Sequence, residues 1–109
     1  MPRTTIQVSF QDAQAHVHEA VKKILLEAGY HEVAYGDEIV WKKGTGMLTA
    51  MQYIKVTYQG NTLFLSGWTR VGLGQYGFKE QDLEGFVAAI PKKMVKKVME
   101  RIQSAVAHM

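Results

Sequence analysis

The last nineteen residues, 91–109, constrain the fold of this chain most strongly, because they predict one long amphipathic helix. Apolar side chains recur there at intervals of three and four residues, which places them on one side of a helix. Pro91 suits the first helical turn, where its missing N–H is not needed. Such a helix must bury its apolar side against another element, so we expect it to close a small domain. The apolar residues span an arc of about 140° on the helical wheel and are Met94, Val95, Val98, Met99, Ile102, Ala105, Val106 and Met109.

The polar side of the same segment concentrates the basic charge of the chain. It carries five basic residues and one acidic residue, whereas the whole chain has a formal net charge of +3. A basic helix surface is usually solvated, but it can also bind phosphate groups or an anionic membrane surface. The segment therefore predicts a candidate anion patch. Its members are Lys92, Lys93, Lys96, Lys97 and Arg101.

The length of 109 residues predicts a single domain, residues 1–109. With 47% hydrophobic residues, the chain can form a core without disulfides or a metal. It has no cysteine, which excludes a thiol nucleophile and a cysteine zinc site. It has neither an apolar leader at its beginning nor an apolar run of membrane-spanning length. We therefore expect a cytoplasmic protein.

Hydrophobic periodicity predicts the element order β-α-β-β-β-β-α. The spacing predicts a helix over 12–28, which Gly29 terminates. Short links such as Gln59-Gly60-Asn61 predict antiparallel neighbours, because parallel strands need long crossovers. Two helices can cover only one face of a sheet, so we expect a two-layer α+β fold with the helices on one face. Strands are expected at 5–10, 31–35, 38–43, 51–58 and 62–71, and a loop at 72–85.

The sheet face opposite the helices is the first candidate for a functional surface. Aliphatic strand residues such as Leu63 and Ile54 are expected to meet the helices. The other face would then expose large aromatic side chains beside basic groups, and an exposed patch of that kind usually has a partner. Three alternatives stay open. Either the two faces are reversed or residues 72–85 fold over the patch; or the patch mediates self-association; or it binds a ligand or nucleic acid. The candidate interface residues are Trp41, Tyr53, Lys55, Phe64, Trp68 and Arg70.

A space between the sheet and the C-terminal helix is the second candidate site. Methionine-containing walls adapt to irregular apolar ligands, although packing of a core explains the same residues. The candidate ligand wall is Val56, Leu63, Leu65, Met94, Val98 and Ile102.

The sequence shows no motif of an enzyme or a metal site in the structural surroundings that such a motif needs. Residues 72–77 match the dinucleotide pattern G-x-G-x-x-G, but no βαβ unit surrounds them. His16 and His18 lie about 200° apart on a helical wheel and cannot share a metal. None of the serines lies in a nucleophile-elbow context. We therefore expect no enzymatic activity, no catalytic or metal-binding residues and no cofactor.

Two short motifs, Trp41-Lys42-Lys43-Gly44-Thr45-Gly46 and the stretch 85–93, resemble a family of small bacterial proteins without an established activity, mostly Gram-positive. The similarity spans residues 33 to 102 and implies no catalytic residues. Some members carry a cysteine-rich zinc ribbon ahead of this module, which the present chain lacks. The element order also resembles the TATA-binding-protein-like and helix-grip arrangement, whose curved sheet carries a long C-terminal helix. That resemblance implies space for an apolar ligand, but a fold analogy does not establish function.

These observations predict a non-enzymatic binding module that forms a homodimer through the aromatic sheet face. One alternative is a carrier of a small apolar ligand between the sheet and the C-terminal helix. The other is a weak nucleic-acid binder that uses the basic helix together with Lys55 and Arg70.

Overall fold

The structure, a computed structural model, describes residues 3–43, 51–70, 80–81 and 89–109. The predicted α+β fold and its element order are confirmed, with one short strand added before the last helix. That strand lies within the stretch expected to be a loop. The elements are β1 (Thr4–Ser9), α1 (Gln14–Glu27), β2 (His31–Tyr35), β3 (Glu38–Lys43), β4 (Met51–Gln59), β5 (Thr62–Arg70), β6 (Glu80–Gln81) and α2 (Ala89–Ala107).

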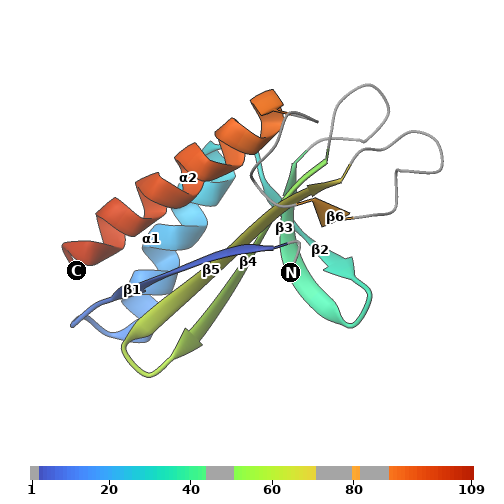
Figure 1. The fold of residues 1–109 in the computed structure, drawn as a ribbon. Helices are drawn as coiled ribbons and strands as arrows, with labels where there is room; N and C mark the ends of the chain where they lie inside the picture. The colour runs from blue at the N-terminus through green and yellow to red at the C-terminus, as the bar shows by residue number, and fades with distance from the viewer. Residues whose placement is uncertain (1–2, 44–50, 71–79, 82–88) are drawn as a thin grey trace.

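The strands form one antiparallel sheet in the order β1-β5-β4-β3-β2. The short strand β6 pairs with the end of β5 and continues the edge beyond β1. Two tight turns join neighbouring strands, and Gly36 and Gly60 within them have positive φ angles of 65° and 57°, which favour glycine. Both helices lie on the same side of the sheet (Figure 1). The opposite side is called the far face below.

The apolar side chains of the strands and of the two helices form one large cluster between the helices and the sheet, called the helix-side core. On the sheet, Ile54, Leu63 and Leu65 are fully buried in it. The helices contribute stripes at intervals of three and four residues, as the wheel requires. The buried stripe of α1 is Val17, Val21, Ile24 and Leu25, and that of α2 is Val95, Met99, Ile102 and Val106.

Helix α2 begins two residues earlier than expected, at Ala89 rather than at Pro91. Pro91 is therefore its third residue. The first four N–H groups of an α-helix have no partner within the helix, so proline is still tolerated at this position. Ile90 is helical although a following proline disfavours that conformation.

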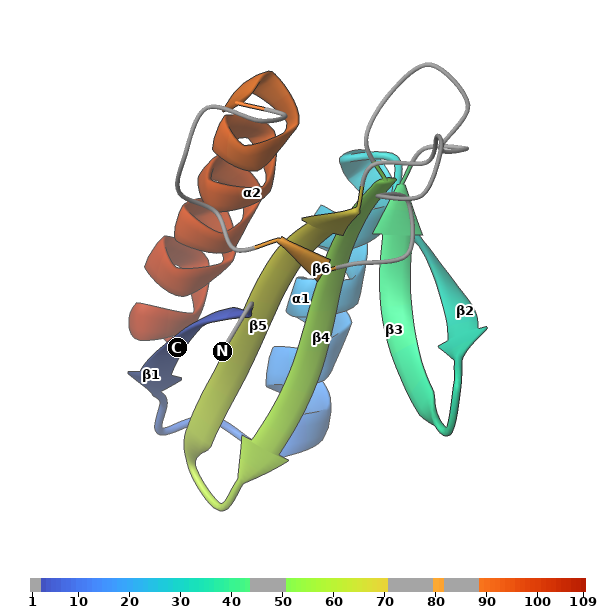
Figure 2. The same ribbon diagram turned by 45° about the vertical axis from the view of Figure 1, so that its right-hand side comes forward.

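The two central hairpins diverge from each other. Among the described residues, β4 and β5 share nine residue pairs, whereas β3 and β4 share three, from Trp41–Ile54 to Lys43–Gln52. The first half of β3, residues 38–40, is unpaired with β4, and the turn end of the β2–β3 hairpin lies apart from β4, as Figure 2 shows. The curvature of this hairpin brings Tyr35 of β2 into contact with Trp68 of β5, two strands beyond its own partner. Tyr35 therefore lies over side chains of β4 and β5 on the far face.

Candidate functional site

The far face carries five of the six candidate interface residues. Strand alternation places Tyr53, Lys55, Phe64, Trp68 and Arg70 on the side opposite the helix-side core. Trp41 is the exception, and its expected place is wrong. It is paired with Ile54 and buried in the helix-side core, because in β3 it is Val40 that faces the other way.

The two largest aromatic residues of this face are buried rather than exposed. Trp68 is 0% exposed and Tyr53 is 3% exposed. Their rings are stacked, with centroids 5.4 Å apart and planes 7° apart. Tyr35 covers both, with its ring centroid 4.9 Å from that of Tyr53 and 5.6 Å from that of Trp68. The expected exposed patch is therefore wrong at its centre, because the curved β2–β3 hairpin covers it.

These three rings are called the aromatic cluster, and a cation lies over two of them, Trp68 and Tyr35. The Arg3 guanidinium carbon lies 3.8 Å from the centre of the Trp68 ring and 5.8 Å from that of Tyr35. A planar guanidinium at such a distance interacts with the negative face of the ring. Arg70 approaches Tyr35 in the same way, with 5.5 Å from its guanidinium carbon to the ring centre. Sequence reasoning missed Arg3, because it precedes the first strand and belongs to no motif.

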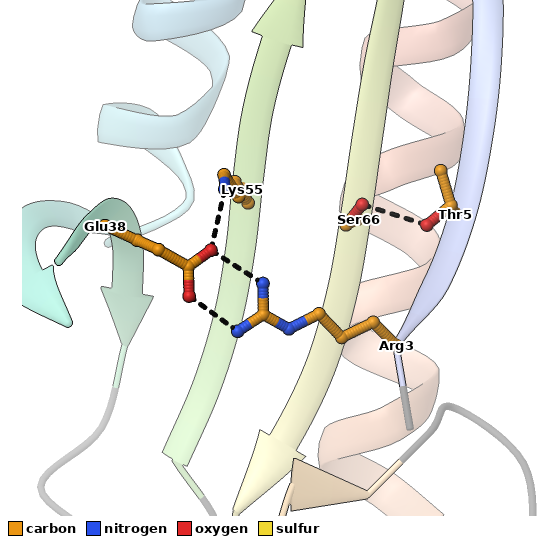
Figure 3. A network of polar contacts seen from close by, with 5 residues as sticks. All are labelled: Arg3, Thr5, Glu38, Lys55 and Ser66. Carbon is orange, nitrogen blue, oxygen red and sulfur yellow. Dashed lines mark hydrogen bonds and ion pairs between the residues drawn. The ribbon is translucent and has the colours of Figure 1, made fainter. Parts of the chain in front are cut away.

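An ion-pair network joins Arg3 to the diverging hairpins. Both terminal nitrogens of Arg3 donate to Glu38, at 2.9 Å each, and Lys55 Nζ donates to Glu38 Oε1 at 2.6 Å. Figure 3 shows the Arg3 side chain extended across β5 and β4 toward Glu38. The side chains of Arg3 and Glu38 are each 23% exposed, so solvent screens this network only in part. Hydrogen bonds from Arg3, and then from Lys55, lower the pKa of Glu38 to about 2.

Replacing Glu38 by glutamine is expected to lower the free energy of unfolding by about 1–2 kcal/mol near neutral pH, since hydrogen bonds to a charged group are lost. The pKa of Glu38 is depressed in the folded chain from its ordinary value of 4.5. Its contribution is therefore complete above about pH 4.5 and is lost as the pH falls toward about 2. Urea denaturation of both proteins across this range should show the difference in stability shrinking.

The matched control is Glu32→Gln, which removes an exposed carboxylate from the neighbouring edge strand β2. We expect that variant to differ from the original protein by no more than about 0.5 kcal/mol. A difference for Glu38→Gln that stays constant from neutral to acid pH would contradict the charge-based account of this network.

The candidate ligand wall is divided between two environments. Leu63, Leu65 and Ile102 are fully buried in the helix-side core, and Val56 and Val98 pack against it. Met94 is 39% exposed and lies beside the buried stripe of α2. Three surface depressions lined by described residues have volumes of about 550, 330 and 270 Å³, and no wall residue lines any of these three. The first is formed by α1 alone, so it is a groove along a helix.

A small set of buried polar side chains lies on the helix side of the sheet, near the start of β4. The Tyr30 hydroxyl donates to Gln52 Oε1 at 2.9 Å, and burial raises the pKa of Tyr30. Gln52 Nε2 donates to the Met94 sulfur at 3.9 Å, a weak contact. Thr69, opposite Gln52 in the ladder, is fully buried, and its hydroxyl has no partner in the described part of the chain. Such neutral groups can hold a water molecule or a polar ligand atom.

The candidate anion patch is smaller than expected. Lys92 is only 4% exposed, which contradicts its expected place on the outer side of the helix. It lies three residues before Val95 and so continues the buried stripe of α2. Arg101 is exposed and forms an ion pair with Glu27 of α1 at 2.9 Å. Lys93 and Lys97 are exposed and Lys96 is half-buried.

The histidines of α1 bond to different neighbours. His16 Nδ1 lies 2.6 Å from Asp12 Oδ2, and His18 Nδ1 lies 2.8 Å from the Tyr58 hydroxyl. Within the four described ranges, no three side chains of the kinds that ligate metals come together. Neither described helix has the length and apolar character needed to cross a membrane.

No protein-family model matches the chain, and neither a curated protein nor a solved structure matches it. The resemblance to the small bacterial family and to the helix-grip arrangement therefore stays a prediction.

Proposed function

We propose that this chain is a non-enzymatic binding module that self-associates through the far face of its sheet. The observation that carries the proposal is the one-sided arrangement of the layers. Both helices pack on the same face, and on the far face the stretch of β1, β5 and β4 around Phe64 stays partly exposed, whereas Tyr35 of β2 covers the stretch around Trp68. A sheet with one free face can gain stability by packing against a second sheet.

The centre of this surface is Phe64 rather than Trp68. Phe64 is half-buried in the middle strand β5, and its ladder neighbours on either side are Gln7 of β1 and Thr57 of β4. Two residues further along β5, the hydroxyl of Ser66 forms a hydrogen bond with that of Thr5 in β1, with 2.9 Å between the two oxygens. Polar side chains around one partly exposed aromatic ring form a surface on which a second copy can pack.

The aromatic cluster supports this surface from one end instead of forming the contact itself. Trp68 and Tyr53 are covered within the chain, so they contribute rigidity and not exposed area. The interface that we propose is therefore more polar than the sequence indicates. Polar, moderately sized interfaces are typical of proteins that associate reversibly.

Replacing Phe64 by lysine is expected to raise the dimer dissociation constant at least tenfold, which corresponds to about 1.4 kcal/mol. Two lysines would meet at the centre of a two-fold interface, where like charges repel. Sedimentation equilibrium or light scattering over a range of protein concentrations measures this change. Thermal unfolding should show that the variant monomer keeps its fold.

The matched control is Leu26→Lys, which places the same charge at an exposed leucine on α1, away from the sheet. That variant should dimerise as the original protein does. A chain that is monomeric at every concentration, or a Leu26→Lys variant that dissociates in place of Phe64→Lys, would show that the proposed surface is wrong.

The two alternative functions stay predictions. The apolar-ligand hypothesis relies on wall residues that are mostly packed in the helix-side core. The nucleic-acid hypothesis relies on a patch from which Lys92 is withdrawn and in which Arg101 is paired with Glu27. Neither arrangement favours its hypothesis over self-association.

A further inference from the structure

The contacts of Arg3 have the chemistry of a guanidinium-binding site. The guanidinium carbon lies over one aromatic ring, 3.8 Å from the centre of Trp68. Its two terminal nitrogens form a bidentate pair with Glu38, with both distances at 2.9 Å. An aromatic face combined with a bidentate carboxylate is the arrangement that selects arginine over lysine.

The walls of this site are held by contacts that do not involve Arg3. Trp68 is stacked on Tyr53, and Tyr35 contacts both rings. Glu38 accepts a hydrogen bond from Lys55 at 2.6 Å, which keeps its carboxylate oriented. The walls come from β2, β3, β4 and β5, whereas Arg3 enters from the segment before the edge strand β1. The site is therefore preorganised by one part of the chain and filled by another.

Arg3 is an incomplete match for the site. Trp68 Nε1 is buried and has no hydrogen-bond acceptor among the residues that the structure describes. A buried donor without an acceptor costs free energy. The side chain of arginine has donors only, so Arg3 cannot satisfy this group. The Arg3 peptide carbonyl does not accept from this N–H either, although it is part of the same chain, whereas the carbonyls of an arginine in another chain are not held in place by β1.

We propose that Trp68, Tyr35 and Glu38 form a binding site for the guanidinium group of an arginine in a protein partner, and that Arg3 fills this site as an internal competitor. Because Arg3 is tethered beside the site, its effective concentration is in the millimolar range. A free arginine ligand therefore binds poorly to the original protein. This inference does not depend on self-association through Phe64.

The test removes the competitor and supplies the ligand. In the Arg3→Ala variant, the N-acetyl arginine amide should bind at least tenfold more tightly than to the original protein. The indole N–H resonance of Trp68 in a two-dimensional NMR titration reports binding, and the thermal midpoint of the variant should rise with ligand. The uncharged, near-isosteric N-acetyl citrulline amide is the matched control and should not bind.

The second variant, Arg3→Ala combined with Glu38→Gln, should lose this binding, because the carboxylate partner is absent. If Arg3→Ala does not fold alone, Arg3→Thr is titrated in its place, because threonine favours the strand that follows and is too short to cover the Trp68 ring. A folded Arg3 variant whose Trp68 resonance and thermal midpoint ignore the arginine amide would overturn the proposal. So would equal responses to the arginine and citrulline amides. Phe64→Lys leaves all these contacts in place, so failure of the proposed dimer is observed separately.

Discussion

Replacing Trp68 by alanine is expected to lower the free energy of unfolding by about 3–5 kcal/mol, a large part of the stability of a domain of this size. The indole is fully buried, although it lies on the sheet face that carries no helix. Its removal leaves a cavity under Tyr53 and Tyr35 and withdraws the ring that the Arg3 guanidinium covers. Chemical denaturation followed by circular dichroism measures the effect without depending on tryptophan fluorescence.

The control for this prediction is Thr57→Ala, an exposed position on the same face. It should change the free energy of unfolding by no more than about 0.5 kcal/mol. If Trp68→Ala costs less than about 1 kcal/mol, then the indole is open to solvent. The far face would then be the exposed aromatic platform that the strand pattern predicts.

The fold of this chain could be predicted from its sequence because the helix and strand periods are clear. Alternation along β5, between Leu63 and Leu65 on one side and Phe64 on the other, matches the observed faces. The short link at Gly60 led to an antiparallel hairpin, which the structure confirms. These features are local, and each depends on side-chain spacing over a few residues.

The aromatic cluster could not be predicted, because the curvature of a sheet is not a local property. Strand alternation shows that Tyr53 and Trp68 share a face, but it cannot show that Tyr35 reaches across to cover them. That contact depends on the three-pair ladder between β3 and β4, which lets the hairpin diverge. The sequence pattern places Trp41 on the wrong face because its strand is short and alternates weakly.

The ion-pair network of Arg3, Glu38 and Lys55 could not be predicted from the sequence for another reason. Arg3 and Glu38 are 35 positions apart, and neither belongs to a recognisable motif. They come together only in the folded sheet, where Arg3 lies over Trp68 and reaches Glu38. A basic residue before a first strand and an acidic residue at a tight turn are common in any soluble domain.

The helical wheel of α2 identified an apolar arc but not its centre. The arc predicts that Met94 is buried and Lys92 is not, and the structure shows the reverse, with 39% and 4% exposure. The buried stripe runs through Val95, Met99 and Ile102, so its centre lies toward Lys92 on the wheel. The direction in which a helix faces is determined by its packing on the sheet and by the neighbouring helix, which the sequence of α2 alone does not contain.

This displacement of the stripe leads to a second large expected effect. Replacing Ile102 by alanine should lower the free energy of unfolding by about 2–5 kcal/mol, because the side chain is fully buried against the sheet. The same change at Met94 should cost much less, about 0.5 kcal/mol, since that side chain is partly exposed and makes only a weak contact with Gln52. Chemical denaturation of both variants measures the difference directly.

The comparison distinguishes a packed core from a ligand cavity. Both residues belong to the candidate wall, and a cavity that holds an apolar guest would make their truncations similarly mild in the empty protein. A large cost at Ile102 alone indicates that the sheet and α2 already fill the space between them, as the burial of Leu63 and Leu65 requires. Equal and small costs at the two positions would contradict the packed arrangement and would favour the carrier hypothesis over self-association.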